Sequence, residues 1–405
     1  MKRRDLKILF HTNAPWSHSG YSVEAKMLIK RMITDGWKTA CSCNFGLQGS
    51  YIEWGGIPCY PTLNDPYGSD AVGQHAKDFG AHIIIPFQDI WTLNPQALFD
   101  INQKGYKIVP YCPIDKDPVP PNVASNLRFS HRIITFSRFG HKTLEDAGLT
   151  STLILEGTDV NIYKSMDQQE MRKKYNIRSD VFVFGMIAAN KENPPRKGFQ
   201  EAIEAFKLFH DRHNEAVLII HSNQVIPSGF PIVQFAQHLN IQKSVLFIAD
   251  YNEIVKSSNI KCAEHYNTFD VLLHPSQTEG FGLTVIEAGS CGKLAIVNDS
   301  TSMPEMIVEG KTGFICKRAG RRFVNDLSYV DYADVPSLYE CMEKAYKLVK
   351  EHPEKTMQDC RDHIMKNYNI DTIYNEKWVK ILTELQDEII PLNNEKTSSN
   401  ISIAG

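Results

Sequence analysis

The sequence lacks the features of membrane, nucleic-acid-binding and disulfide-rich proteins. Its 405 residues carry a net charge of only −3, so charge gives no reason to expect a nucleic-acid or acidic-membrane partner. No apolar run approaches the roughly 18–20 residues of a membrane span. Lys7 interrupts the short apolar stretch behind Lys2-Arg3-Arg4, which is too short for the core of a signal peptide. We therefore predict a soluble, cytoplasmic protein with no integral membrane segment.

Cysteine and histidine show no ligand pattern. The nine cysteines are odd in number and form no C-x-x-C pair, which is typical of reduced, mostly buried thiols in an intracellular protein. The fourteen histidines show no H-x-x-x-H spacing on a plausible helix. Both patterns argue against a disulfide framework and against a zinc site.

What the sequence does contain is an alternation of strands and helices. With 42% hydrophobic and 22% charged residues, the chain is globular and long enough for two domains. In a first series we expect strands at 6–10, 37–43, 81–85, 107–111, 132–136 and 152–155. In a second series we expect strands at 181–187, 216–220, 245–248, 271–273 and 294–297, and a helical region at 336–392. Short apolar strands with helices between them indicate an α/β fold of two doubly wound parallel sheets.

The most informative stretch, Glu279 to Glu287, joins a buried strand to a helix through a Gly-x-Gly turn. We expect the helix at 284–290, with a stop at Gly292. A glycine turn at a helix N-terminus aims backbone N–H groups at an anion, typically a phosphate. Glu287 could then accept hydrogen bonds from ribose hydroxyls, and Glu279 would face the group beyond the phosphate, as suits a nucleotide-sugar. The alternative is an ordinary strand–helix junction, because Val285 stands where a dinucleotide fingerprint needs its third glycine.

Two further loops lie at the carboxyl ends of predicted strands, where open α/β sheets bind ligands. Arg196-Lys197-Gly198 precedes a helix expected at 199–209, and its two cations would neutralise a diphosphate. The alternative, a solvated basic pair, is weakened because cations oppose the dipole of a helix N-terminus unless an anion binds there. Gly20, before the first long helix, would let the backbone approach a ligand closely.

These motifs resemble those of the retaining GT-B glycosyltransferases of family 4, also called glycosyl transferases group 1. The resemblance rests on the Glu279–Glu287 motif and Arg196-Lys197-Gly198, with Cys291-Gly292, Met303-Pro304-Glu305, Glu309 to Phe314, Phe136 to Gly140 and Glu156-Gly157-Thr158-Asp159. It runs in the family's order from about residue 130 to 315, and the first 125 residues match more loosely. It implies the GT-B fold, in which two Rossmann-like domains face a central cleft.

The resemblance also implies a division of the chain. Residues 1–160 would form an N-terminal domain on the acceptor side, and residues 161–369 a C-terminal domain that binds the nucleotide-sugar donor. A C-terminal helix at about 370–392, which includes Trp378, would cross back and complete the first domain. The polar tail at 393–405 is expected to be disordered.

The family transfers a sugar from a nucleotide-diphosphate-sugar to an acceptor hydroxyl, with retention at the anomeric carbon and without an obligatory metal or cofactor. Carried over to this chain, Arg196 and Lys197 would hold the diphosphate, Glu279 the sugar hydroxyls and Glu287 the ribose. The loop at Gly20 would close on the phosphates. The expected backbone donors are Gly280, Phe281, Gly282, Leu283 and Thr284. A glycan, lipid, protein, small molecule or modified nucleic-acid base could be the acceptor.

A pair of carboxylates can also serve a retaining mechanism through a covalent intermediate, which would make Glu279 a nucleophile. The resemblance implies otherwise, because the family places this residue on the hydroxyl side of the sugar. The family's usual route keeps the incoming and leaving groups on one face, and the departing phosphate helps to deprotonate the acceptor.

The predicted acceptor side departs from the family. Many relatives carry a first-domain histidine, but here the strand at 107–111 is followed by Cys112-Pro113-Ile114-Asp115. Asp115 is the candidate to replace that histidine, and the alternative is a turn aspartate. Asp89-Ile90-Trp91 is a second acceptor-side candidate. Lys293 replaces the family's usual proline and Ser302-Met303 a glycine pair, and neither change removes an expected donor contact.

Two motifs resemble functional sites of other protein classes, and several alternative functions are compatible with the predicted fold. Asp115-Lys116-Asp117 satisfies the D-x-D metal clamp of the other glycosyltransferase fold, which the second α/β series disfavours. Gly310-Lys311-Thr312 imitates the end of a P-loop, but Glu305 occupies the position of the earlier glycine. A nucleotide-sugar epimerase, a sugar phosphorylase and a non-catalytic nucleotide-sugar or glycan-binding protein are the alternatives on this fold.

Overall fold

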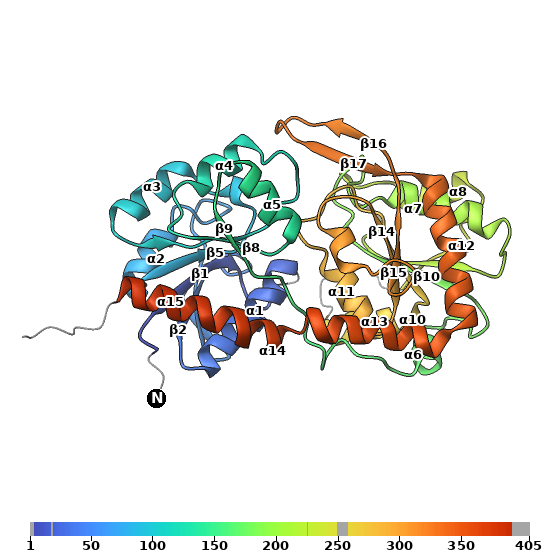
Figure 1. Ribbon diagram of the computed structural model, residues 1–405, viewed down its shortest axis with the longest axis horizontal. Helices are drawn as coiled ribbons and strands as arrows, with labels where there is room; N and C mark the ends of the chain where they lie inside the picture. Colours follow the sequence, from blue (N-terminus) through green and yellow to red (C-terminus); the bar gives the residue numbers. More distant parts are fainter. Residues whose placement is uncertain (1–3, 18, 225, 249–257, 391–405) are drawn as a thin grey trace, which may run out of the picture.

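The computed structural model describes residues 4–17, 19–224, 226–248 and 258–390. Two α/β halves lie side by side, the first coloured blue to teal and the second green to orange in Figure 1. The predicted tail at 393–405 lies outside the described residues. No helix in the described ranges is long and apolar enough to cross a membrane. All the cysteines except the partly exposed Cys262 are buried free thiols, as predicted.

The first half is built on a six-stranded sheet of order β3-β4-β2-β1-β5-β6. Its strands are β1 (Lys7–Asn13), β2 (Lys38–Phe45), β3 (Ile52–Trp54), β4 (Ile57–Tyr60), β5 (Ile83–Pro86) and β6 (Lys107–Ile108). All pairs are parallel except β3 with β4, and β1 lies at the centre, where Leu9 is opposite both Ala40 and Ile84. The covering helices are α1 (Gly20–Thr34), α2 (Val72–Phe79) and α3 (Pro95–Gln103). Strands β3 and β4 were not predicted from the sequence.

The strand predicted at 107–111 is wrong as a single element. The chain forms β6 in the main sheet and then β7 (Tyr111–Cys112), which pairs with β8 (Ile133–Thr135) in a separate sheet of order β7-β8-β9. The break falls at Pro110, which has no N–H to continue the β5 ladder. Its carbonyl instead accepts a hydrogen bond from the N–H of Ile134 at 2.8 Å. Helices α4 (Pro121–Leu127) and α5 (Arg138–Asp146) and strand β9 (Ser151–Leu153) complete this part.

The second half is built on a wholly parallel sheet of order β12-β11-β10-β13-β14-β15. Its strands are β10 (Val183–Ile187), β11 (Val217–His221), β12 (Val245–Phe247), β13 (Val271–His274), β14 (Leu294–Asn298) and β15 (Gly313–Cys316). The helices are α6 (Gln168–Lys174), α7 (Phe199–His210), α8 (Ile232–His238), α10 (Asn259–Thr268), α11 (Leu283–Ser290) and α12 (Val335–Glu351). Except for β15, the strands follow the predicted second series.

An antiparallel hairpin that the sequence analysis did not predict projects from the second half toward the first (Figure 1). It consists of β16 (Arg318–Phe323) and β17 (Tyr329–Ala333), and every residue of β16 is exposed. The N–H of Tyr329 donates to the carbonyl of Asp117 at 3.2 Å, and Lys116 pairs with Asp326 in the hairpin turn. The hairpin therefore bridges the two halves at the segment that carries Asp115.

The C-terminal helices return to the first half along one side of the molecule (Figure 1). After α13 (Pro353–Asn367) come α14 (Ile370–Ile373), a π-helical turn (Tyr374–Trp378) and α15 (Val379–Ile389). The ring of Trp378 lies 5.0 Å from that of Tyr111, and the N–H of Asp5 donates to Oε1 of Gln386 at 2.7 Å. The chain passes between the two halves twice, and backbone hydrogen bonds join the two connecting segments. The N–H of Thr158 donates to the carbonyl of Tyr368, and the N–H of Ile370 donates to the carbonyl of Thr158. The domain boundaries at 160 and 369 stay predictions.

Candidate functional site

The predicted glycine turn begins α11. Gly282 is the N-cap, with φ 118°, a left-handed conformation that favours glycine. A Cβ atom at this position would lie 2.8 Å from Cε of Met306. The helix then runs from Leu283 to Ser290, close to the predicted 284–290, and Gly292 follows it with φ 77°. The helix therefore begins just after β13, at the carboxyl edge of the sheet, where a helix N-terminus can bind an anion.

The Arg196-Lys197-Gly198 loop lies beside this turn, because β10 and β13 are neighbours in the sheet. Gly198 is the N-cap of α7 with φ 70°, and a Cβ atom there would lie 2.2 Å from the carbonyl oxygen of Pro275. The N–H of Gln277 donates to the carbonyl of Arg196 at 2.8 Å. Two loops from different strands are thus fixed against each other through their backbones.

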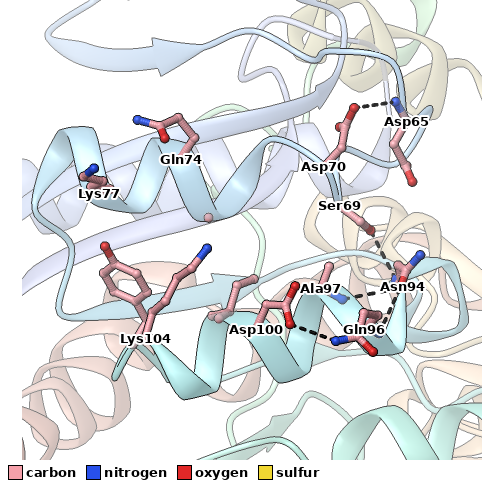
Figure 2. A pocket seen from close by; sticks show the side chains of 13 residues that line it. Asp65, Ser69, Asp70, Gln74, Lys77, Asn94, Gln96, Ala97, Asp100 and Lys104 are labelled. Carbon is pink, nitrogen blue, oxygen red and sulfur yellow. Dashed lines mark hydrogen bonds between the residues drawn. The ribbon is translucent and has the colours of Figure 1, made fainter.

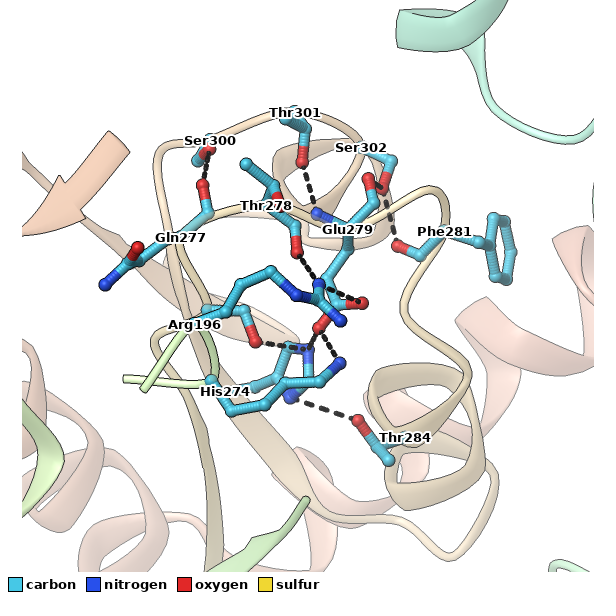
Figure 3. A network of polar contacts seen from close by, with 12 residues as sticks. Arg196, His274, Gln277, Thr278, Glu279, Phe281, Thr284, Ser300, Thr301 and Ser302 are labelled. Carbon is cyan, nitrogen blue, oxygen red and sulfur yellow. Dashed lines mark hydrogen bonds and ion pairs between the residues drawn. The ribbon is translucent and has the colours of Figure 1, made fainter. Parts of the chain in front are cut away.

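Glu279 is the centre of a buried charge network (Figure 3). Its Oε1 lies 2.5 Å from Nζ of Lys197 and 3.1 Å from Nε2 of His274, and its Oε2 lies 3.7 Å from Nη1 of Arg196. Nη1 of Arg196 also donates to the carbonyl of Thr278 at 2.6 Å. The structure therefore brings together three of the predicted residues, with Glu279 between the two cations.

The charges in this network hold each other in the ionised state. Burial by itself would raise the pKa of Glu279, but Lys197, a hydrogen bond from His274 and Arg196 hold it well below its usual value. Burial lowers the pKa of Lys197, and the neighbouring Glu279 carboxylate opposes that shift. At neutral pH the site therefore combines a carboxylate with fixed cations, so it can meet both hydroxyl groups and an anion.

A second set of hydrogen bonds surrounds Glu279, and the roles of His274, Thr301 and Ser302 in it were not predicted from the sequence. The N–H of Glu279 donates to Oγ1 of Thr301 at 2.9 Å, and the hydroxyl of Ser302 donates to the carbonyls of Glu279 and Phe281. Nδ1 of His274 lies 3.1 Å from Oγ1 of Thr284. His274 ends the buried strand β13, and a polar residue at the carboxyl end of such a strand was the signal that could have found it.

Glu287 lies apart from that network, on the buried side of α11. Its Oε2 accepts a hydrogen bond from the hydroxyl of Tyr266 at 2.7 Å. Burial raises its pKa to about 7, while hydrogen bonds from Tyr266 and Tyr163 act in the opposite direction. The two carboxylates of one motif thus differ: Glu279 is ionised by paired cations, and Glu287 titrates near neutral pH.

The first half contributes residues across the interface. Gly20 is the first residue of α1, and a Cβ atom there would lie 3.3 Å from Cδ1 of Leu283 at the start of α11. A Cβ atom on Gly280 would lie 2.5 Å from Cβ of Pro113, which precedes Asp115 by two residues. A side chain at either position 20 or position 280 would therefore meet a residue of the other half.

Acidic side chains of the first half face Arg196. Burial lowers the pKa of this guanidinium, but Glu279, Asp115, Glu192 and Asp89 together raise it. Asp89 accepts a hydrogen bond from the hydroxyl of Tyr21 at 2.8 Å. Burial and the charge of Asp115 raise the pKa of Asp89. Both acceptor-side candidates from the sequence thus lie within electrostatic reach of the predicted phosphate-binding cation.

Two buried glutamates near this interface were not predicted as site residues. Glu24 in α1 is fully buried, and neither of its carboxylate oxygens has a hydrogen-bond partner of good geometry. Burial raises its pKa to about 8. Burial and the charges of Glu24, Glu279 and Glu287 raise the pKa of Glu156 well above its usual value. The charge of Glu287 acts on the pKa of both acids, so both lie close to α11.

Other motif residues have structural contacts. Glu305 accepts hydrogen bonds from the N–H groups of Arg138 and Phe139, so it caps α5 of the other half. Oδ2 of Asp117 lies 3.7 Å from Nη2 of Arg321, whose Nε pairs with Oδ1 of Asp331 at 2.8 Å. Within the described ranges, no group of three or more His, Cys, Asp or Glu side chains is arranged to hold a metal ion.

Comparison with known proteins finds related sequences for part of the chain. Residues 167–325 match the family model described as glycosyl transferases group 1. The chain is 27% identical over 159 residues to N-acetyl-alpha-D-glucosaminyl L-malate synthase of Bacillus anthracis, which is 39% of this chain and 38% of that protein. It is 25% identical over 221 residues to the capsular polysaccharide biosynthesis glycosyltransferase CapM of Staphylococcus aureus, which is 52% of this chain and 50% of that protein. The matched regions thus span half or less of these relatives.

Solved structures share the arrangement of both halves. Sucrose-phosphate synthase from Thermosynechococcus elongatus superposes with a TM-score of 0.75 at 13% identity, over 94% of this chain and all of that chain. Anabaena Alr3699/HepE, solved in complex with UDP and glucose, gives 0.71 at 16% identity, over 93% and 99%. These similarities, with the two facing sheets, confirm the predicted GT-B fold.

Proposed function

We propose that this protein is a glycosyltransferase that moves a sugar, with retention, from a nucleotide-diphosphate-sugar to an acceptor hydroxyl. The observation that carries the proposal is the buried network of Glu279, Lys197, His274 and Arg196 beside the N-terminus of α11. A carboxylate between two cations, at a helix start, matches the alternation of hydroxyls and phosphates in such a donor. The group 1 family match over residues 167–325 supports the same conclusion.

In the proposed reaction Arg196, Lys197 and the N–H groups from Gly280 to Thr284 bind the diphosphate. The bond between the anomeric carbon and the phosphate oxygen breaks, and negative charge grows on the leaving diphosphate. Fixed cations stabilise that charge where it develops, because they need no reorganisation during the step. The acceptor oxygen bonds to the anomeric carbon on the same face, and its proton passes to the departing phosphate.

Glu279 is assigned to the sugar hydroxyls and Glu287 to the ribose. Oε1 of Glu279 already contacts Lys197 and His274, and Oε2 makes the longer contact, to Arg196. A carboxylate held by so many partners is better suited to accept hydroxyl hydrogen bonds than to attack carbon. Glu287 lies about one turn inside α11, where an accepting oxygen can meet a nucleoside placed behind the diphosphate.

Asp115 and the Gly20 loop are assigned to the acceptor side and to closure on the phosphates. The proposal includes no metal and no cofactor, and a cytoplasmic location stays a prediction from cysteine usage. A nucleotide-sugar epimerase, a sugar phosphorylase and a non-catalytic nucleotide-sugar or glycan-binding protein remain the alternatives. An epimerase would isomerise the bound donor without an acceptor, and a phosphorylase would cleave its sugar substrate with phosphate. A non-catalytic binding protein would leave the donor unchanged.

A thermal-shift screen with UDP-, GDP-, ADP- and dTDP-sugars, followed by mass analysis of products with candidate acceptors, tests the proposal. UDP-glucose is a suitable first probe, since a HepE structure contains it. An acceptor whose mass increases by one sugar supports the proposal. Donor isomerisation without acceptor, phosphate-dependent cleavage, or binding without turnover would each select one of the alternatives.

A further inference from the structure

The proposed transfer depends on residues of both halves, and the hairpin β16–β17 contacts both of them. The groove of about 790 Å³ between α2 and α3 does not, because all the residues that line it lie between 65 and 106, within the first half (Figure 2). The hairpin belongs to the second half, and its turn reaches the segment of the first half that carries Asp115. It is therefore an element that can set the position of one side of the site relative to the other.

The base of the hairpin is tied to the loop that carries Glu279. The N–H of Asp331 in β17 donates to the carbonyl of Gln277 at 3.4 Å. The hydroxyl of Ser300 donates to the same carbonyl at 2.6 Å (Figure 3) and lies 3.1 Å from Oδ2 of Asp331. Asp331 is only 3% exposed, so these contacts are shielded from water. A movement of the hairpin base would therefore displace the loop two residues before Glu279.

The other end of the hairpin holds the segment that carries Asp115. Lys116 forms an ion pair with Asp326 in the hairpin turn. The N–H of Tyr329 donates to the carbonyl of Asp117 at 3.2 Å, so these two residues pair as in an antiparallel sheet. The hairpin therefore contacts both of the residues that directly follow Asp115.

Arg321 of β16 connects the two ends of the hairpin. Its Nε lies 2.8 Å from Oδ1 of Asp331, and its Nη2 lies 3.7 Å from Oδ2 of Asp117. Its guanidinium carbon lies 5.0 Å from the ring centre of Tyr329. A planar guanidinium between two carboxylates and an aromatic ring is held in one orientation. A chain of contacts therefore runs from the Glu279 loop through the hairpin to Asp117.

We propose that the hairpin β16–β17 is a clasp that positions Asp115 against the donor site during sugar transfer. Arg321 and the ion pair at the hairpin turn are its positioning groups. The second half also contacts this segment before Asp115, because a Cβ atom on Gly280 would lie 2.5 Å from Cβ of Pro113. The inference rests on the proposed function, because it adds a positioning device to the same site.

The clasp should matter more for the reaction than for stability. The side chains of Lys116 and Asp326 are 22% and 30% exposed, and an ion pair of this exposure contributes little to the free energy of unfolding. A displacement of about 1 Å at a reacting group, in contrast, can lower a rate by about 10²-fold. A variant that loses the clasp should therefore stay folded and transfer sugar more slowly.

Charge reversal tests the inference with the full-length protein. Asp326→Lys places two cations side by side, and it should speed amide hydrogen exchange at Tyr329 by about tenfold or more, because the carbonyl partner on the first half is displaced. The double variant Lys116→Asp/Asp326→Lys re-forms the pair with the charges exchanged, so it should restore the exchange rate of the parent. The matched control Asp146→Lys breaks an exposed Lys–Asp pair within α5 and should exchange like the parent.

The same variants are compared in sugar transfer, with UDP-glucose as the first donor. We expect Asp326→Lys to lower kcat by about tenfold or more and to leave KM for the donor within about twofold, and we expect the double variant to recover kcat. Parent-like exchange at Tyr329 in Asp326→Lys, or faster exchange that the double variant does not restore, would overturn the clasp. Faster exchange with a parent-like kcat would overturn its role in transfer.

A thermal-shift titration of the parent and these variants with UDP-, GDP-, ADP- and dTDP-sugars separates failure of the clasp from failure of the proposed function. If a nucleotide-sugar stabilises all of them alike while exchange at Tyr329 and kcat stay unchanged, the clasp is wrong and the donor site stands. If no nucleotide-sugar stabilises the parent, the proposed function fails, and the exchange rates alone decide whether the hairpin joins the two halves.

Discussion

The carboxyl edges of the two main sheets are built in different ways. At the second edge, Glu279 is 8% exposed and has Lys197, His274 and Arg196 as partners. At the first edge, the side chain of Trp91 is half exposed and packs edge-on against Tyr67. A fixed diphosphate is best met by preorganised charges, whereas flat exposed aromatics tolerate ligands that vary in detail. Under the proposed function, the second edge binds the donor and the first edge lies on the acceptor side.

The same contrast appears in the buried carboxylates. Glu279 in the second half is paired with cations, so its pKa is held well below the usual value despite burial. Glu24 in the first half is buried without a partner of good geometry, and its pKa is raised to about 8. The buried Glu279 of the second half is therefore part of a charged network suited to a ligand. The buried Glu24 of the first half instead favours the protonated state.

The largest expected effect comes from removing a cation at the second edge. Lys197→Ala should lower the rate of sugar transfer by about 10²-fold or more, because a fixed donor to the growing diphosphate charge is lost. Initial rates at saturating donor measure this. Lys243→Ala, an exposed lysine on the same half, is the control. Equal rates for the two variants would remove Lys197 from the site.

A smaller effect is expected at Glu287, and it should depend on pH. Only the ionised carboxylate accepts hydrogen bonds through both oxygens, so donor affinity should rise as pH increases through the pKa of about 7. Glu287→Gln should bind the donor about tenfold more weakly, equivalent to about 1.4 kcal/mol, without that pH dependence. Calorimetric titration one pH unit below and above this pKa checks both points. A variant that keeps the parent's pH dependence would assign it to another group.

The buried acid Glu24 of the first half should affect stability rather than binding. Because the folded-state pKa of Glu24 is raised above the ordinary 4.5, its favourable contribution exists below that value and is lost as pH rises through about 8. Glu24→Gln should reduce this loss by about 1 kcal/mol or more. Urea unfolding at several pH values measures it, with the exposed Glu53→Gln as control. Identical pH profiles for Glu24→Gln and the parent would contradict the assignment.

The smallest effect concerns the contact that joins the two regions. Glu305 of the second half caps α5 of the first half through the N–H groups of Arg138 and Phe139. Glu305→Ala should lower the free energy of unfolding by about 1 kcal/mol, as loss of a helix cap does. Denaturant unfolding compares it with Glu340→Ala, an exposed glutamate on α12. A variant as stable as this control would show that the cap contributes nothing between the halves.

Sequence patterns predicted the parts of the fold that depend on short-range signals. Buried strands such as β10 and β14 are continuous apolar runs. The start of α11 is predicted by the Gly282 turn, whose residues are neighbours in the chain. The strand at 107–111 was wrong because Pro110 diverts the chain to another sheet, and only the positions of β5 and β8 decide which. The exposed hairpin β16–β17 lacks apolar alternation on one strand, so it was missed.

The candidate site was predictable to the same extent. The residues of the Glu279–Glu287 motif and the Arg196-Lys197 pair stand in recognisable local sequences. The contacts of Glu279 with His274, Thr301 and Ser302 come from separate strand-end loops, and their meeting is fixed by the sheet order. On the acceptor side the sequence predicted only the separate candidates Asp115 and Asp89-Ile90-Trp91, because the neighbours of an exposed residue such as Trp91 come from other parts of the chain.

The most direct test of the central claim, that the second edge binds the donor, is a thermal-shift comparison of the parent and Lys197→Ala. Both are titrated with UDP-, GDP-, ADP- and dTDP-sugars. The account predicts that at least one nucleotide-sugar raises the Tm of the parent in a saturable way, and that Lys197→Ala needs about tenfold more of it or does not respond. If no nucleotide-sugar shifts the parent, or if both proteins respond at the same concentrations, the account is contradicted.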